Sequence, residues 1–350
     1  MWLSKNELSS SSDLTGKHTD WRDRASFSLL QKFFKKRKIE GRILRMLDSG
    51  EGFQGSIWSA SNQTDVWNRT VGSKDHQWFW PEKDSYDAAI LRLPKSKREL
   101  EMCVHIAFSS LRAECPLWVY GSNDEGIKSS EKVLWPLAKT VTTVAYGGRC
   151  RVLQAMASSE FSYKNELSDW KNVTRIDLPG FNRDWVSYPG VFADGKLDSG
   201  TEVLIKALPS IPDDSRVLDF ACGTGLVGGA VQVQLKSGSV DFLDVDLIAL
   251  AAVQQNIPGA RVIPSDGFGR LEDERYDLIV SNPPYHQGKI WSEDFIMGMV
   301  TGAVAHLNQD GTLIFVAQRR LQIERLISAH FREIKVLSDQ DSYRVWSAKL

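Results

Sequence analysis

Residues 216–225, RVLDFACGTG, point most directly to the architecture of this chain. The first half, Arg216–Phe220, is an apolar run typical of a buried parallel strand. Ala221–Gly225 follows as a glycine-containing loop, and residues 226–235 predict a helix. Because glycine lets a backbone approach a ligand closely, strand, loop and helix start together predict a ligand-binding corner. The loop lacks the third glycine of a dinucleotide fingerprint, and the chain has no Gly-Lys-Ser/Thr of a phosphate-binding P-loop.

Two acids follow at the ends of the next predicted strands. Asp244 ends a strand over 239–243 and lies about 20 residues beyond the loop, where a carboxylate can bind ribose hydroxyls. Asp266, followed by Gly267, ends a strand over 260–263 and can accept a hydrogen bond from an adenine amine. Both positions suit an adenosyl ligand.

The fourth predicted strand, 276–280, ends in Asn282-Pro283-Pro284-Tyr285. Two prolines cannot continue a strand, so they fix a stiff turn at its tip. The Asn282 side-chain oxygen and the Pro283 carbonyl can accept the two N–H groups of a planar amine, and Tyr285 can stack on its ring. By itself the motif also fits an ordinary turn. With the glycine loop and both acids, it predicts an adenosyl ligand without a pyrophosphate.

On these residues the segment 186–350 resembles a class I S-adenosylmethionine-dependent methyltransferase. It is similar in particular to the ribosomal RNA guanine-N2 methyltransferases of the small-subunit type, through FADGKLDSGT at 192–201 and Asn-Pro-Pro-Tyr-His at 282–286. The chain departs from the usual pattern at Ala221 and at Tyr285, which replaces Phe. The resemblance implies an α/β fold of two tandem Rossmann-like methyltransferase domains. The second has a seven-stranded mixed sheet ending in an antiparallel hairpin, here expected at 311–317, 331–337 and 343–349, with a helix at 321–330.

The resemblance also implies a cofactor and a reaction. The cofactor is S-adenosyl-L-methionine, and the reaction is direct methyl transfer to the exocyclic N2 amine of a guanine in ribosomal RNA, with 16S small-subunit RNA favoured. The cofactor-binding residues carried over are Asp219, Gly223, Gly225, Asp244, Asp266, Gly267 (or Phe268 beside it), Leu197, Asp198, Gly200 and Thr201. The catalytic residues carried over are Asn282, Pro283, Pro284 and Tyr285, and no metal is expected. His286 either accepts a proton or contacts the RNA backbone.

The N-terminal half reads as a degenerate copy of this domain. Its segments 86–94, 117–120 and 150–155 mirror 276–284, 313–316 and 343–348, at separations of 190, 196 and 193 residues. Arg92 stands where Asn282 stands in the second copy, so the first should not catalyse. We expect a degenerate domain over 1–160 that serves RNA binding or structure, a linker over 161–185 and the catalytic domain over 186–350. Gly50–Gly55 matches Gly-x-Gly-x-x-Gly, but the segment 42–48 before it reads equally well as a helix end, which argues against a dinucleotide loop.

A basic stretch between Arg22 and Arg45 is interleaved with Phe27, Phe33 and Phe34. Cations for phosphates and rings for bases suit structured RNA. The same pattern suits an amphipathic helix with a solvated charged face, and the sequence leaves both open.

Composition limits the partners. The 350 residues carry a net charge of −1, so any RNA contact must come from a local patch. Four scattered cysteines, no apolar run of membrane-spanning length and no apolar signal region favour a cytoplasmic protein without a membrane segment. The resemblance implies ribosomal RNA or a ribosomal subunit as the partner, and we expect a monomer. Two alternatives stay open. One is an N-methyltransferase for another planar amine (a large-subunit RNA guanine, a protein glutamine or a DNA adenine), and the other is a non-catalytic RNA-binding assembly factor.

Overall fold

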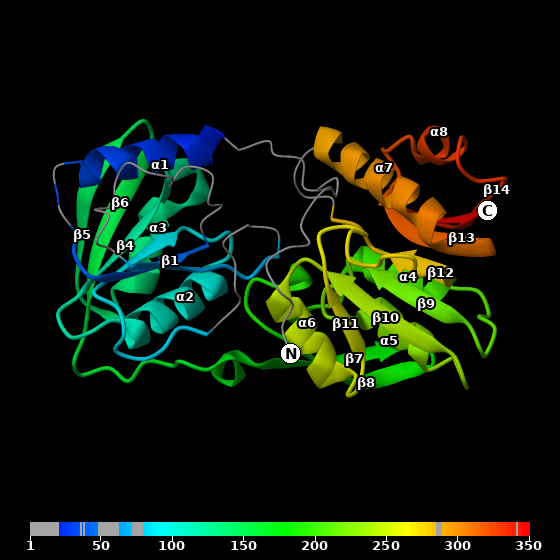
Figure 1. Ribbon diagram of the computed structural model, residues 1–350, viewed down its shortest axis with the longest axis horizontal. Coiled ribbons are helices and arrows are strands. Elements are labelled where there is room, and N and C mark those ends of the chain that lie inside the picture. The colour runs from blue at the N-terminus through cyan, green and yellow to red at the C-terminus, as the bar shows by residue number, and fades with distance from the viewer. Residues whose placement is uncertain are drawn as a thin grey trace. The chain divides into compact units, whose positions relative to one another are not determined.

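The computed structural model describes residues 21–35, 37, 39–47, 63–71, 80–284, 289–340 and 342–350, without the side chains of Asp194 and of 289–293. Tyr285, His286, Lys36, Lys38 and the segment 50–55 lie outside the described residues. The described chain forms two compact units, labelled in Figure 1: an N-terminal unit of residues 21–172 and 188–190, and a C-terminal unit of 173–187 and 191–350. Each unit is described by itself.

The C-terminal unit is built on a seven-stranded sheet in the order β11-β10-β9-β12-β13-β15-β14. Its strands are β9 (Arg216–Phe220), β10 (Ser239–Asp244), β11 (Arg261–Pro264), β12 (Tyr276–Ser281), β13 (Leu307–Gln318), β14 (Glu333–Gln340) and β15 (Tyr343–Lys349). Strands β9 to β13 pair in parallel, and β15 is antiparallel to both of its neighbours. The predicted seven-stranded mixed sheet with its terminal hairpin is confirmed.

Helices bury both faces of this sheet. On one face, apolar side chains from α4 (Ser199–Ala207), α5 (Leu226–Gln232) and α6 (Leu247–Asn256) pack with strand residues such as Val217. On the other, α7 (Lys289–His306) and α8 (Ile323–Ile327) pack with residues that include Leu218. Successive strand side chains point to opposite faces, so a continuous apolar run serves both layers.

Two helices are shorter than the sequence predicts. α5 ends at Gln232 rather than at 235, because the chain then turns so that the amides of Lys236, Ser237 and Gly238 all bond to the Asp213 carbonyl. α8 covers only 323–327 of the predicted 321–330. The predicted strand boundaries at 260–263, 311–317 and 331–337 each shift by one to four residues.

The segment 161–185, which we predict as a linker, contains regular structure. A short 3-10 helix (Leu167–Trp170) leads into a hairpin of β7 (Asn172–Leu178) and β8 (Phe181–Ser187). Buried side chains of the hairpin, Phe181 and Trp185 among them, pack on Leu226 and Ala230 of α5. The hairpin reads as polar sequence because exposed charged residues lie between its buried ones, namely Arg175, Asp177, Arg183 and Asp184.

The N-terminal unit holds a six-stranded sheet in the order β2-β1-β3-β4-β6-β5. Its elements are β1 (Arg42–Met46), β2 (Gln63–Trp67), β3 (Ala88–Arg92), β4 (Pro116–Ser122), β5 (Ala138–Gly147) and β6 (Cys150–Ala157), with α1 (Trp21–Phe34), α2 (Lys97–Ser110) and α3 (Ile127–Leu134). Residues 42–46 of the segment that we predict as a possible helix end are therefore a strand, because β1 pairs in parallel on both sides, with β2 and with β3.

Strand order and register confirm the predicted duplication. The order β2-β1-β3-β4-β6-β5 repeats β10-β9-β12-β13-β15-β14. Leu117 of β4 lies opposite Ala155 of β6, just as Leu313 of β13 lies opposite Ala348 of β15. The sequence repeat aligns the same residues, Leu117 with Leu313 and Ala155 with Ala348.

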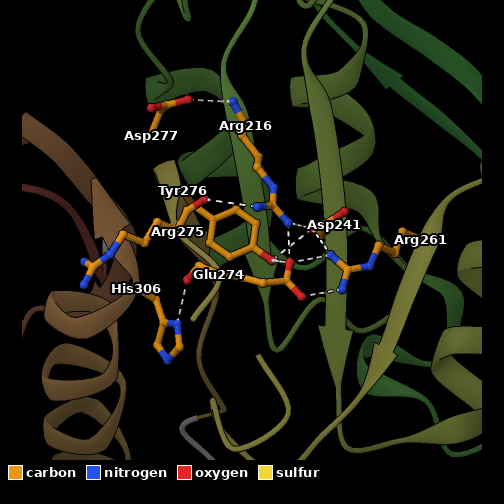
Figure 2. A network of polar contacts seen from close by, with 8 residues as sticks. All are labelled: Arg216, Asp241, Arg261, Glu274, Arg275, Tyr276, Asp277 and His306. Carbon is orange, nitrogen blue, oxygen red and sulfur yellow. Dashed lines mark hydrogen bonds and ion pairs between the residues drawn. The ribbon is translucent and has the colours of Figure 1, made fainter. Parts of the chain in front are cut away.

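A polar network at the amino ends of the strands in the C-terminal unit is shown in Figure 2. The Arg216 backbone N–H donates to Asp277 Oδ2 at 2.8 Å, and the Arg216 guanidinium pairs with Asp241 at 3.2 Å. The Tyr276 hydroxyl donates to the same Asp241 oxygen at 2.9 Å. The network ties β9, β10 and β12 together at the end of the sheet away from the glycine loop.

The N-terminal unit contains the same network. The Arg42 N–H donates to Asp87 Oδ2 at 2.7 Å, and the Arg42 guanidinium pairs with Asp65 at 2.7 Å. The Tyr86 hydroxyl donates to Asp65 Oδ2 at 3.0 Å. In each unit the arginine also lies 4.7 Å from the centroid of the tyrosine ring. Two copies of one hydrogen-bond pattern at matched register support an origin by duplication.

The basic stretch forms α1 over residues 21–34, and its aromatic residues are not available to bases. Phe33 and Phe34 are buried against Trp118 in the core of the N-terminal unit, and Phe27 packs on the same cluster. The prediction that these rings serve RNA is therefore wrong for this helix, because adjacent positions 33 and 34 face the sheet. Lys32 and Lys35 stay exposed. Within the described part of the chain, no helix combines the length and apolar character needed to cross a bilayer.

Candidate active site

Asp219, at the end of β9, anchors the helix that follows the glycine loop. Its Oδ2 accepts a hydrogen bond from the Gly228 N–H at 2.7 Å, and burial raises the pKa of this carboxyl well above its usual range. A Cβ at Gly228 would lie 2.8 Å from that oxygen and 2.4 Å from Phe242. The close approach of α5 to β9 therefore requires glycine at 228.

The glycine loop turns through residues with positive φ, which glycine adopts readily and alanine rarely. Ala221, Gly223 and Gly225 all have positive φ, at 55°, 54° and 81°. A Cβ at Gly223 would meet no described atom within 4 Å, so the space in front of the loop is open. This is the room that a ligand against the backbone needs. Cys222 in the same loop is buried, which raises the pKa of its thiol well above the usual range, so it is a poor nucleophile.

Asp244, at the end of β10, faces this loop. Its Oδ2 accepts from the Gly223 N–H at 2.7 Å and its Oδ1 accepts from the Asp246 N–H at 2.8 Å. Burial, with a smaller contribution from Asp246, raises the pKa of Asp244 to about 6. Asp246 itself accepts from the first amides of α6, so it caps that helix and Asp244 is the acid directed at the loop.

The tip of β11 lies beside Asp244. The Ser265 N–H donates to the Asp244 carbonyl at 3.0 Å, and Asp266 and Gly267 follow, half-buried and buried. Phe268 is buried and stacks on Phe220, with centroids 4.4 Å apart, and on His306. Its ring belongs to the core, so a contact with adenine falls to the backbone of Gly267 or Phe268, and this role stays a prediction.

The entry segment meets the Asn-Pro-Pro turn directly. Asp198 is the N-cap of α4, and its Oδ2 accepts from the Thr201 N–H at 3.0 Å. Asn282 Nδ2 donates to the same Asp198 oxygen at 3.0 Å and to Thr201 Oγ1 at 2.8 Å. Residues more than 80 positions apart thus form one polar cluster. Both side chains bond the Asn282 amide, and the contact of Asp198 and Thr201 with the cofactor that we expected stays a prediction.

The turn after β12 is held to the glycine-loop strand. The Ser281 hydroxyl donates to the Phe220 carbonyl at 2.8 Å, which fixes the tips of β12 and β9 side by side. Pro283 is buried and Pro284 is exposed. Gly200 is buried, and a Cβ there would lie 3.0 Å from Asp198 Oδ2 and 3.2 Å from the Tyr343 ring.

Two residues that the sequence did not single out support the glycine loop. Trp185 of β8 donates from its indole nitrogen to Thr224 Oγ1 at 3.0 Å. Asn256, at the end of α6, donates to the Thr224 carbonyl at 3.1 Å and accepts from the Val186 N–H at 2.6 Å. Leu197 packs on the same hairpin cluster. The signal in the sequence was the apolar spacing of the hairpin residues, which charged neighbours obscured.

Two family models match the chain. "Methyltransferase small domain" matches residues 182–347, and "Methyltransferase small domain N-terminal" matches residues 54–173. Curated relatives match both halves together. A ribosomal RNA small subunit methyltransferase C of Ectopseudomonas mendocina (strain ymp) is 32% identical over 311 residues, covering 88% of this chain and 91% of the relative. A protein of the same name from Shewanella sp. (strain MR-4) is 30% identical over 271 residues, covering 76% and 78%.

A solved structure has the same fold. It is a T. thermophilus 16S rRNA N2 G1207 methyltransferase in complex with AdoMet and guanosine, with a TM-score of 0.79 and 22% sequence identity, covering 95% of this chain and 93% of that one. This likeness confirms the predicted α/β fold of two tandem methyltransferase-like domains.

Proposed function

Because the chain belongs to the family of ribosomal RNA small subunit methyltransferase C, we propose that it transfers a methyl group from S-adenosylmethionine to the exocyclic N2 amine of a guanine in 16S ribosomal RNA. It then acts in the cytoplasm, on ribosomal RNA or a ribosomal subunit, as a monomer without a metal. The relatives' name supports the substrate class, and the name of the solved structure supports the guanine N2 position.

The observation that carries this proposal is the hydrogen bonding of Asn282. Both of its amide hydrogens are donated within the protein, to Asp198 and to Thr201. The group left for a substrate is the side-chain oxygen, which accepts hydrogen bonds and therefore suits an amine. Asn282 Oδ1 and the Pro283 carbonyl would each hold one hydrogen of the amine, which aims the nitrogen lone pair in one direction. Tyr285 would stack on the base, and the proton released by the amine goes to solvent.

The residues at the strand tips fit the cofactor. The open space in front of Gly223 gives room for a ligand against the backbone, and the Asp244 carboxylate beside it supplies an acceptor for ribose hydroxyls. Gly223 and Gly225 would hold its methionine end, with buried Asp219 anchoring α5 behind the loop, and Asp266 with Gly267 would hold its adenine. S-adenosylmethionine, when bound, supplies a methyl group already activated by a positively charged sulfur. The chain's own residues then need only to bind, orient and exclude water.

We propose that the N-terminal domain, residues 1–160, is non-catalytic and that residues 186–350 are the catalytic domain. Matched strand registers place Arg45 at the position of Asp219, Asn68 at that of Asp244 and Arg92 at that of Asn282.

At two of these positions the N-terminal unit has an arginine, Arg45 and Arg92, where the C-terminal unit has an acid or an amide. A cation at these positions disfavours binding of a positively charged cofactor. Arg92 is also buried in ion pairs with Asp23 at 2.7 Å and Glu125 at 2.5 Å. These two ion pairs give Arg92 a structural role within the N-terminal unit.

The test is transfer of labelled methyl from S-adenosylmethionine to isolated small and large ribosomal subunits and to their naked RNAs, using the full chain. We expect label in small-subunit RNA. Label in large-subunit RNA or in ribosomal protein would move the function to another planar amine. Stoichiometric cofactor binding without any transfer would favour an RNA-binding assembly factor.

A further inference from the structure

Asp198, Thr201 and Asn282 form a closed triangle of hydrogen bonds. Asn282 Nδ2 donates to Asp198 Oδ2 at 3.0 Å and to Thr201 Oγ1 at 2.8 Å, and the Thr201 hydroxyl lies 3.5 Å from Asp198 Oδ2. We propose that Asp198 and Thr201 are positioning residues for methyl transfer, which fix the rotation of the Asn282 amide so that its Oδ1 faces the target amine. This inference rests on the proposed function of Asn282.

The donors and acceptors of these three side chains allow only one orientation of the Asn282 amide. An ionised carboxylate can only accept, so Asp198 requires the NH2 end of the amide beside it. The Thr201 hydroxyl accepts the second amide hydrogen while its own hydrogen is directed at Asp198. A 180° flip of the amide would place Oδ1 against the carboxylate and break both hydrogen bonds. The flipped amide would also present donors to an amine, which is itself a donor.

The geometry of α4 keeps the two partners in place. Asp198 is fixed as the helix N-cap through the Thr201 N–H, at 3.0 Å, and Thr201 is 7% exposed. Helix capping needs only that backbone contact. The cap is closed by the Thr201 N–H, whereas the contact with Asn282 is made by the buried Thr201 hydroxyl, so a substitution of the side chain can separate the two. Gly200 leaves room for the carboxylate in this position, because a Cβ at 200 would lie 3.0 Å from Asp198 Oδ2.

Thr201→Val tests this with little change in shape, because it keeps the β-branch and the N–H that Asp198 caps. We expect kcat to fall about 10- to 100-fold, with the cofactor Kd and the RNA KM within about threefold, because a loosened amide misplaces the amine. Thr201→Ser should restore most of the lost kcat. Ser199→Ala, at an exposed position in the same turn, is the control and should leave kcat unchanged. Wild-type kcat in Thr201→Val, or a loss that lies in the cofactor Kd, would overturn the proposal.

A second readout does not depend on activity. In the NMR spectrum of the full chain, with Asn282→Asp used to assign the peak, the two Nδ2 protons of Asn282 should exchange slowly with water. Thr201→Val should shift one proton and speed its exchange. An unchanged pair of signals would contradict the triangle itself, whereas failure of the proposed function would appear as absence of transfer by the wild-type protein.

Discussion

The Asn282 side chain presents one oxygen to a substrate, because Asp198 and Thr201 take both of its hydrogens. Replacing it with alanine removes the acceptor for the target amine but no residue of the glycine loop. For Asn282→Ala we therefore expect kcat to fall about 10²- to 10³-fold, in the range found when one preorganised polar group is removed from an active site. The cofactor Kd should stay within a few-fold. Titration calorimetry together with single-turnover transfer measures both, and a lost cofactor affinity would make Asn282 a structural residue.

Asp244 gives the cofactor site a pH dependence. Burial raises the pKa of Asp244 to about 6 from the usual 3.8. Between pH 3.8 and pH 6 this carboxyl is therefore mostly protonated in the folded protein and mostly ionised in the unfolded chain. The contribution of Asp244 to folding stability is therefore largest below pH 3.8 and is lost as the pH rises through 6.

Cofactor binding should have the opposite dependence, because the ionised carboxylate is the better acceptor for ribose hydroxyls. We expect affinity to be about tenfold weaker at pH 5 than at pH 7, since one pH unit below the pKa leaves about a tenth of the group ionised. Asp244→Asn, neutral at both values, should bind weakly and without this dependence. Equal cofactor Kd values for the wild type at pH 5 and 7 would contradict the assignment of Asp244.

At the scale of elements, the β7–β8 hairpin supports the glycine loop through Trp185 and Thr224. Trp185→Phe keeps an aromatic ring and removes the indole donor. We expect cofactor affinity to fall about two- to tenfold, the worth of one hydrogen bond, with kcat at saturating cofactor nearly unchanged.

Trp170→Phe is the matched control for the hairpin. Trp170 is also buried, but its indole nitrogen bonds to no residue that the structure describes, and it belongs to the N-terminal unit. Its replacement should leave the cofactor Kd as it is. Equal effects of the two substitutions would mean that the hairpin merely stabilises the protein.

The elements also show what a sequence can predict. The strands of the C-terminal unit are short apolar runs whose ends carry glycine or polar residues, so their order and their tips could be predicted. The hairpin could not, because exposed charged residues interrupt its few buried apolar positions. The contact of Asp198 with Asn282 joins residues 84 positions apart, and local patterns carry no information on such a pair. Phe33 and Phe34 were ambiguous because a buried helix face and an RNA-stacking surface require the same residue types.

For the whole molecule, the exposed cations of α1 offer the N-terminal unit a means of holding RNA. Lys32→Glu with Lys35→Glu should weaken RNA binding and reduce the slope of log K against log salt by about 1.5, since each lost phosphate contact removes about 0.7–0.9. Lys128→Glu with Lys132→Glu makes the same charge change on α3, which packs against α2, and should alter the slope less. Filter binding between 50 and 200 mM salt measures it, and equal slopes for wild type and the α1 variant would exclude this surface.

The two units of the chain share their sheet order and differ in the polar residues at the strand tips. The N-terminal unit, which we propose is non-catalytic, keeps the Arg42, Asp65 and Tyr86 network and has arginines at the positions of Asp219 and Asn282. The two units are thus alike at the amino ends of the strands and differ at the carboxyl ends.

The most direct measurement is mass spectrometry of nucleosides from small-subunit RNA treated with S-adenosylmethionine and either the wild-type chain or Asn282→Ala. We predict N2-methylguanosine with the wild-type protein and little or none with the variant. A methylated nucleoside other than N2-methylguanosine, or equal amounts of product from both proteins, would contradict the assignment of this site to guanine N2 methylation.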